Sequence, residues 1–118
     1  CTTWDRTLKP PEEIFRALLE SGNDMAEQSY NYRLLDDATK SILAQLTLEA
    51  KAAEGVGSMA EAKDIALSAS TYRDHLKACA EASRIAERAK IRYYSTKSYA
   101  DHCRTAEASH RAAMGSAP

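Results

Sequence analysis

Apolar side chains recur every three or four residues along most of the chain, which is the spacing of one face of an α-helix. Three stretches carry this pattern, over residues 12–21, 26–54 and 58–114. They predict a single all-α domain across 1–118, in which a short N-terminal helix docks on a long antiparallel helical hairpin. The residues before the first helix, 1–11, contain two prolines at their end and predict an extended arm.

Proline, glycine and capping residues set the predicted ends of the first two helices. The proline and two acidic residues at 11–13 favour a first helical turn, because proline has no donor to lose there and acidic groups suit a helix N-terminus. Gly22 predicts the end of the short helix. Asp24 and Glu27 have the spacing of a capping box, which predicts the start of the second helix.

The length of the third stretch sets a packing problem. Glycines within 55–57 end the second helix, and Ser58 with Glu61 forms another capping box, so the short linker predicts an antiparallel pair. At about 1.5 Å per residue, the last helix is longer than the first two combined. It therefore breaks near 94–98, where β-branched and hydroxyl residues lower helix propensity, or its far end frays or packs on another subunit. We expect oligomerisation, as a dimer or a larger helical bundle.

The four-three spacing in the last helix predicts a coiled-coil seam. The seam comprises Ile65, Ala69, Tyr72, Leu76, Cys79, Ser83, Ala86, Lys90 and Tyr93. The residues predicted for the hairpin core are Leu35, Ile42, Leu46, Ile65, Tyr72 and Leu76. Those predicted for the contact between subunits are Ile85, Ala89 and Tyr93, on a second apolar face.

Composition makes the predicted core thin. Apolar residues form 44% of the 118 positions, but many are alanine, and there is one Trp and one Phe. The net charge of −1 hides an acidic first half and a basic second half, since residues 1–58 hold 6 Lys and Arg against 10 Asp and Glu, and 59–118 hold 10 against 7. Such halves could fold on each other or pair between subunits.

A basic, tyrosine-rich segment from Arg84 to Tyr99 offers nucleic-acid binding as an alternative. Basic side chains neutralise phosphates, and tyrosines stack on unpaired bases. The candidate contacts are Arg84, Arg88, Lys90, Arg92, Tyr93, Tyr94 and Lys97. The pI of about 6.3 is below that of dedicated nucleic-acid-binding domains, so a solvated helix face with tyrosines at a subunit contact is the first interpretation.

Histidine, cysteine and glutamate pairs suggest two further hypotheses, metal binding and catalysis by a thiol. His75 and Cys79 lie four residues apart, and Glu107 and His110 have the spacing found in di-iron bundles. No matching glutamates lie on the apolar face of the second helix, and no third orienting group accompanies Cys79 or Cys103. We therefore expect no catalytic residue, no metal, no cofactor and no enzymatic activity.

Three cysteines at no framework spacing predict reduced thiols and a cytoplasmic protein. No apolar run approaches the length of a membrane span. Two further hypotheses concern the start of the chain: Cys1 could carry a lipid anchor, or Met25 could be the native first residue.

Part of the second half resembles small helical proteins encoded by bacteriophages and prophages. The similar segments are 72–76 (YRDHL), 87–93 (ERAKIRY) and 104–109 (RTAEAS). The resemblance implies a bacterial mobile-element origin and roles in DNA metabolism or host-protein binding, and it assigns no catalytic residue. Together these observations predict a non-enzymatic helical interaction or scaffold protein, with a nucleic-acid-binding accessory protein as the alternative.

Overall fold

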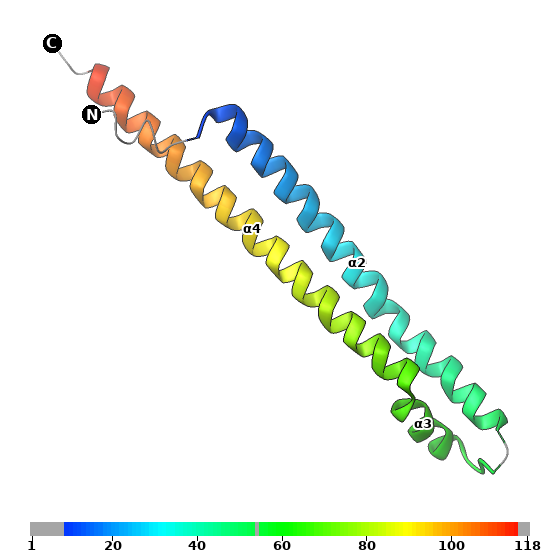
Figure 1. Cartoon of the computed structure of the whole chain (residues 1–118). Coiled ribbons are helices and arrows are strands. Elements are labelled where there is room, and N and C mark those ends of the chain that lie inside the picture. The colour runs from blue at the N-terminus through cyan, green and yellow to red at the C-terminus, as the bar shows by residue number, and fades with distance from the viewer. Residues whose placement is uncertain (1–8, 54, 116–118) are drawn as a thin grey trace. The chain divides into compact units, whose positions relative to one another are not determined.

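The computed structural model describes residues 9–53 and 55–115, and these form three α-helices and no strand. The helices are α2 (Pro11–Ala52), α3 (Met59–Ser68) and α4 (Ser70–Gly115) (Figure 1). The predicted arm over 1–11 lies largely outside the described residues. Lys9 and Pro10 are not helical, and Pro11 begins α2 as the proline and acidic residues predict.

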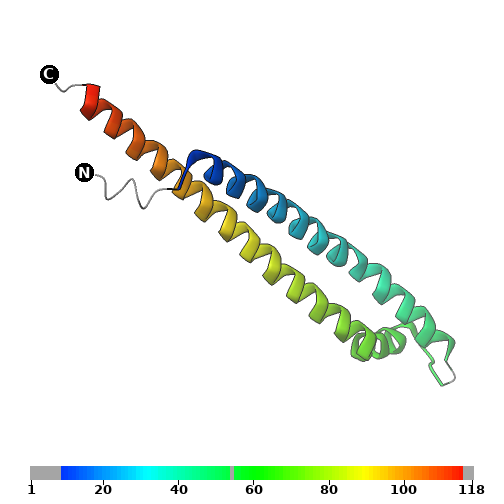
Figure 2. The same ribbon diagram turned by 45° about the horizontal axis from the view of Figure 1, so that its top comes forward.

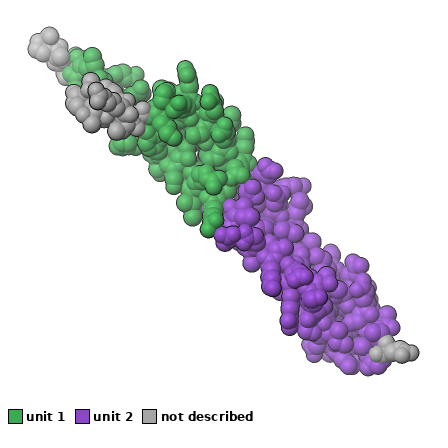
Figure 3. Space-filling view, in the orientation of Figure 1, with its two compact units in different colours: residues 1–26, 88–118 green, residues 27–87 purple. Residues whose placement is uncertain are grey.

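The contacts of the chain group into two compact units, whereas the sequence predicts a single domain (Figure 3). Unit 1 comprises Cys1–Ala26 and Arg88–Pro118, and unit 2 comprises Glu27–Glu87. Within unit 2, α2 and α4 run antiparallel and are joined through a short linker and α3 (Figures 1 and 2). Within unit 1, the start of α2 lies antiparallel beside the second part of α4. The predicted all-α class and antiparallel hairpin are confirmed.

The predicted separation of a docking helix over 12–21 from a second helix over 26–54 is wrong, because α2 is continuous from Pro11 to Ala52. Gly22 does not end the helix, because it does not adopt a positive φ and the ring of Tyr93 packs on its backbone. Asp24 does not cap a new helix either, since its carboxylate accepts a hydrogen bond from Arg92. Helix α2 ends two residues before the predicted end, and Glu54 lies outside the described residues.

The linker after α2 follows the predicted turn chemistry. Gly55 has φ +84°, a left-handed conformation that glycine adopts without steric cost. The backbone N–H of Glu61 donates to Ser58 Oγ at 3.1 Å, which confirms Ser58 as the N-cap of α3. The Glu61 carboxylate accepts in return from the N–H of Gly57 at 3.2 Å. These reciprocal bonds fix the start of α3.

The long helix predicted over 58–114 breaks at Ala69 and not at 94–98. Ala69 has φ −65° and ψ 141°, an extended conformation that separates α3 from α4. The break lets α3 turn so that Ala62 and Ala66, 0% and 1% exposed, become buried. Around 94–98 the helix continues, because small differences in propensity do not break a packed helix. Thr96 Oγ1 donates to the carbonyl of Arg92 at 2.8 Å, which satisfies its hydroxyl group within the helix.

Helix α4 packs through a seam that alternates by three and four residues. Its members are Tyr72, His75, Cys79, Ala82, Ala86, Ala89, Tyr93, Thr96, Ala100 and Cys103. The coiled-coil spacing is as predicted, but His75, Ala82 and Ala89 take the places predicted for Leu76, Ser83 and Lys90. Small side chains let the helix backbones approach, so alanines and not the larger neighbours decide which face is buried.

Four of the six predicted core residues are half-buried: Leu35, Ile42, Leu46 and Tyr72. The other two predictions, Ile65 and Leu76, are wrong, because both side chains are exposed. In α3 the alanines at 62 and 66 take the inner face that Ile65 was expected to occupy.

Candidate interaction surface

Full burial is confined to small residues in the part of the chain that the structure describes. Among the residues that the structure describes, the buried apolar set is Ala62, Ala66, Ala86, Ala89, Ala100 and Cys103. No large side chain in that part of the chain is fully buried. The larger apolar side chains flank the helix contacts, where solvent reaches them. The larger apolar side chains are therefore at the surface, where assembly with a partner can bury them.

In unit 1, Gly22 and Tyr93 bring α2 and α4 close together. A methyl group added at Gly22 would lie 3.4 Å from Tyr93 Cε1, so the aromatic ring rests directly on the glycine backbone. Tyr93 also meets Tyr94 edge to face, with ring centroids 5.3 Å apart. Tyr93 therefore lies in the contact between the helices, and Tyr94 beside it is exposed to solvent.

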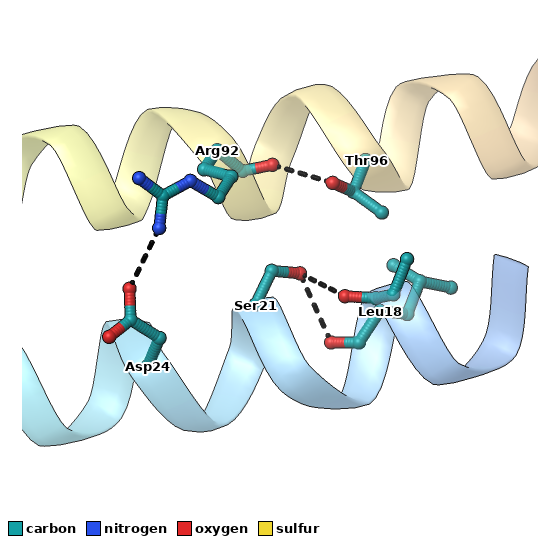
Figure 4. A network of polar contacts seen from close by, with 6 residues as sticks. Leu18, Ser21, Asp24, Arg92 and Thr96 are labelled. Atoms are coloured by element: carbon teal, nitrogen blue, oxygen red, sulfur yellow. Dashed lines mark hydrogen bonds and ion pairs between the residues drawn. The ribbon is translucent and has the colours of Figure 1, made fainter. Parts of the chain in front are cut away.

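A polar network borders this contact (Figure 4). Ser21 is buried, and its hydroxyl group lies 2.7 Å from the carbonyl oxygen of Ala17 and 3.2 Å from that of Leu18, so its polar group is satisfied within α2. Arg92 of α4 reaches across to Asp24 of α2 at 3.1 Å. Because both side chains are partly exposed, this ion pair contributes about 0–1 kcal/mol and chiefly sets the register of the two helices.

The main hollow of unit 1 is an apolar groove between the start of α2 and the second part of α4. Its larger part has a volume of about 640 Å³, and an adjoining part of about 330 Å³ shares several lining residues. We call this surface the unit 1 groove. It is lined by Ile14, Phe15, Leu18, Leu19, Ala100, Cys103 and Arg104.

The rim of the unit 1 groove is mainly basic. The charged rim residues are Lys9, Lys97, Arg104 and Arg111 against Asp101 and Glu107. Arg104 pairs with Asp101 at 2.5 Å along α4. The backbone N–H of Lys9 donates to the Tyr99 hydroxyl at 3.2 Å, which ties the residues before α2 to α4. An apolar floor with a basic rim suits the apolar face of a helix flanked by acidic side chains.

Unit 2 contains a different polar cluster, formed by Thr39, His75 and Cys79. His75 Nε2 lies 2.9 Å from Thr39 Oγ1 and 3.4 Å from Cys79 Sγ. Thr39 Oγ1 also lies 3.3 Å from the carbonyl oxygen of Leu35, and the tautomer of His75 sets which of these groups donates to its ring nitrogen. The cluster joins α2 to α4 within unit 2.

The other sequence-predicted pairs do not assemble into a metal centre. Glu107 and His110 lie along the unit 1 groove. Across residues 9–53 and 55–115, no group of three or more His, Cys, Asp and Glu side chains is placed to hold a metal ion. In the same part of the chain, no helix has both the length and the apolarity that a membrane span requires.

The three residues predicted for a subunit contact do not share a free face. Ile85 is exposed, but Ala89 is 2% exposed within the single chain and Tyr93 packs on Gly22. Ala89 therefore has almost no exposed surface to offer a second copy, and the contact between subunits stays a prediction. The burial of Ala89 follows from the register of the α4 seam, in which it occupies the position that the sequence assigned to Lys90.

The predicted nucleic-acid residues are divided between pairs within the chain and solvent. The hydrogen bond from Arg84 to Glu81 and the charge of that carboxylate raise the pKa of Arg84. Arg92 binds Asp24, and Tyr93 is engaged in the helix contact. The remaining members, Arg88, Lys90, Tyr94 and Lys97, are exposed.

The unit 1 groove was missed from the sequence. A signal for it was present, because Ile14, Phe15, Leu18 and Leu19 form an apolar face wider than one helix contact uses. Comparison of the chain with protein-family models, curated proteins and solved structures finds no match.

Proposed function

We propose that this protein is a non-enzymatic helical scaffold that assembles with itself through apolar side chains on its helices. One observation carries the proposal: large apolar residues are exposed while only alanines and one cysteine form the buried apolar set of the described residues. The most exposed are Phe15, Leu48, Ile91 and Met114. Covering such side chains stabilises by about 25 cal/mol per Å² of apolar surface, which gives assembly a driving force.

The exposed area supports the same proposal. The chain exposes 8697 Å², whereas a compact monomer of 13.0 kDa exposes about 6300 Å². For two chains the excess is about 4800 Å², which lies within the range of total area that an obligate dimer interface buries. Assembly would bring the exposed area per chain toward that of a compact protein.

Two further parts of the proposal rest on sequence features. Cys79 and Cys103 are free thiols, which suits the reducing environment of the cytoplasm. The resemblance of 72–76, 87–93 and 104–109 to bacteriophage and prophage proteins favours an origin in a mobile element.

Self-association makes stability depend on protein concentration. Because only the folded assembly binds further copies, the free energy of unfolding per dimer rises by about 1.4 kcal/mol for each tenfold rise in concentration. We expect the midpoint of urea unfolding, followed by far-UV circular dichroism, to increase between micromolar and higher concentrations. A midpoint that does not move over a hundredfold range would contradict the proposal.

Nucleic-acid binding is the second candidate, supported by the segment 88–97, which holds four basic residues and no acidic one. The scaffold proposal predicts that a mixed single-stranded oligonucleotide does not bind at physiological salt. Fluorescence anisotropy of a labelled oligonucleotide tests this. Binding that weakens steeply with salt and is lost in the triple variant R88A/K90A/R92A would favour the second candidate, because phosphate contacts release counterions.

A further inference from the structure

Two surfaces of this chain have complementary character, the unit 1 groove and an exposed ridge on α2 in unit 2. We propose that the groove of one copy accepts the ridge of a second copy. The inference rests on the proposed function, since it names the contact through which the scaffold assembles.

The groove offers an apolar floor that nothing in the described chain covers. Phe15 and Leu19, one helical turn apart on α2, are 68% and 55% exposed. Ala100 and Cys103 of α4 lie on the other side of the hollow and are buried. Small residues on α4 leave room for an inserted side chain, while Phe15 and Leu19 provide apolar area for it to contact.

The ridge is formed by Tyr30 and Leu34, which are one turn apart and 55% and 52% exposed. The half-buried residues of the same stretch, among them Tyr32, Leu35 and Thr39, lie on a different face of α2. Tyr30 and Leu34 therefore point away from the contact with α4 and remain available to a partner. One aromatic and one aliphatic side chain, four residues apart, are typical anchors of a helix that docks in a groove.

Charge favours this ridge as the occupant. Glu27 and Asp37 lie three residues before Tyr30 and three residues after Leu34, on the same helical face, and both are exposed. Arg33 is exposed at the edge of this face, so acidic residues outnumber basic ones by two to one. The rim of the groove has four basic residues against two acidic ones. Acidic side chains at the two ends of the ridge would meet this basic rim, which orients the contact.

The contact is heterologous, because the two partners use different surfaces. Every copy then keeps one unused groove or ridge, and assembly continues until a ring closes or a filament forms. This property makes the contact testable by mixing, since a chain without its ridge still has a groove and a chain without its groove still has a ridge.

The test uses two full-length double variants. Phe15→Gln with Leu19→Gln removes the groove anchors, and Tyr30→Gln with Leu34→Gln removes the ridge anchors. Glutamine is a good helix former and adds no charge, so the helical circular dichroism should stay unchanged. Leu76→Gln is the matched control, because Leu76 is an exposed leucine of α4 outside the groove and the ridge.

We expect each double variant alone to be a 13.0 kDa monomer by light scattering, while the Leu76→Gln control assembles like the wild type. Mixing the two double variants should give a species of twice the monomer mass that does not grow further. A monomeric wild type would contradict the proposed function and this inference together. An assembled wild type whose variants stay assembled, or whose variants do not pair on mixing, would overturn this inference alone and assign the groove to another occupant.

Discussion

Replacing Ala89 by leucine lowers the free energy of unfolding by about 1–3 kcal/mol. Ala89 is 2% exposed and lies in the alanine seam of α4, next along the seam to Tyr93. Three additional carbon atoms have no space there, so the helices must move apart or the leucine must adopt a strained rotamer. Urea unfolding at one fixed protein concentration measures the change.

Ala80→Leu is the matched control for this prediction. Ala80 lies on the same helix but is exposed, so the larger side chain extends into solvent. We expect its stability to stay within about 0.5 kcal/mol of the wild type. Equal destabilisation by Ala89→Leu and Ala80→Leu would contradict the close packing of the α4 seam.

Replacing Ala66 by aspartate detaches α3. Ala66 and Ala62 are the buried residues of this helix, and a carboxylate at position 66 would have to be buried without a partner. A burial cost of a few kcal/mol exceeds what a ten-residue helix gains by docking through two alanines. An isolated helix of that length is marginal in water, so undocking also unfolds it.

Far-UV circular dichroism measures this effect as the loss of the helical signal of ten residues, without loss of the signal of α2 and α4. Ala60→Asp is the control, because Ala60 is exposed in the first turn of α3, where an acidic side chain favours the helix. A full helical signal in the Ala66→Asp variant would show that α3 does not depend on its buried alanines.

Local sequence signals predicted that the chain is helical, but they predicted only some of the helix ends correctly. The capping box of Ser58 and Glu61 and the turn at Gly55 are local features, and both occur in the structure. Gly22 is a local signal for a helix end. The helix continues through it because Gly22 packs against Tyr93, which is distant in the sequence. Ala69 is a strong helix former, so its extended conformation follows from the docking of α3 and has no local signal.

The packed face of α4 was predicted only in part for a related reason. Hydrophobicity favours Leu76 and Ile85 as contact residues, whereas close approach of two helices favours Ala82 and Ala89. When most apolar positions are alanine, several faces of a helix have similar apolar character, and the choice between them depends on the partner helix. The unit 1 groove depends on that same choice, since it exists only where α4 presents Ala100 and Cys103 to the start of α2.

The most direct test of self-assembly is the solution mass of the wild-type chain, measured by light scattering over a range of concentrations at low and high salt. We predict a multiple of 13.0 kDa that persists at high salt, because salt screens the rim charges but does not weaken apolar contacts. A mass of 13.0 kDa at every concentration and salt would contradict the account, since the exposed apolar side chains would then have no copy of the chain to cover them.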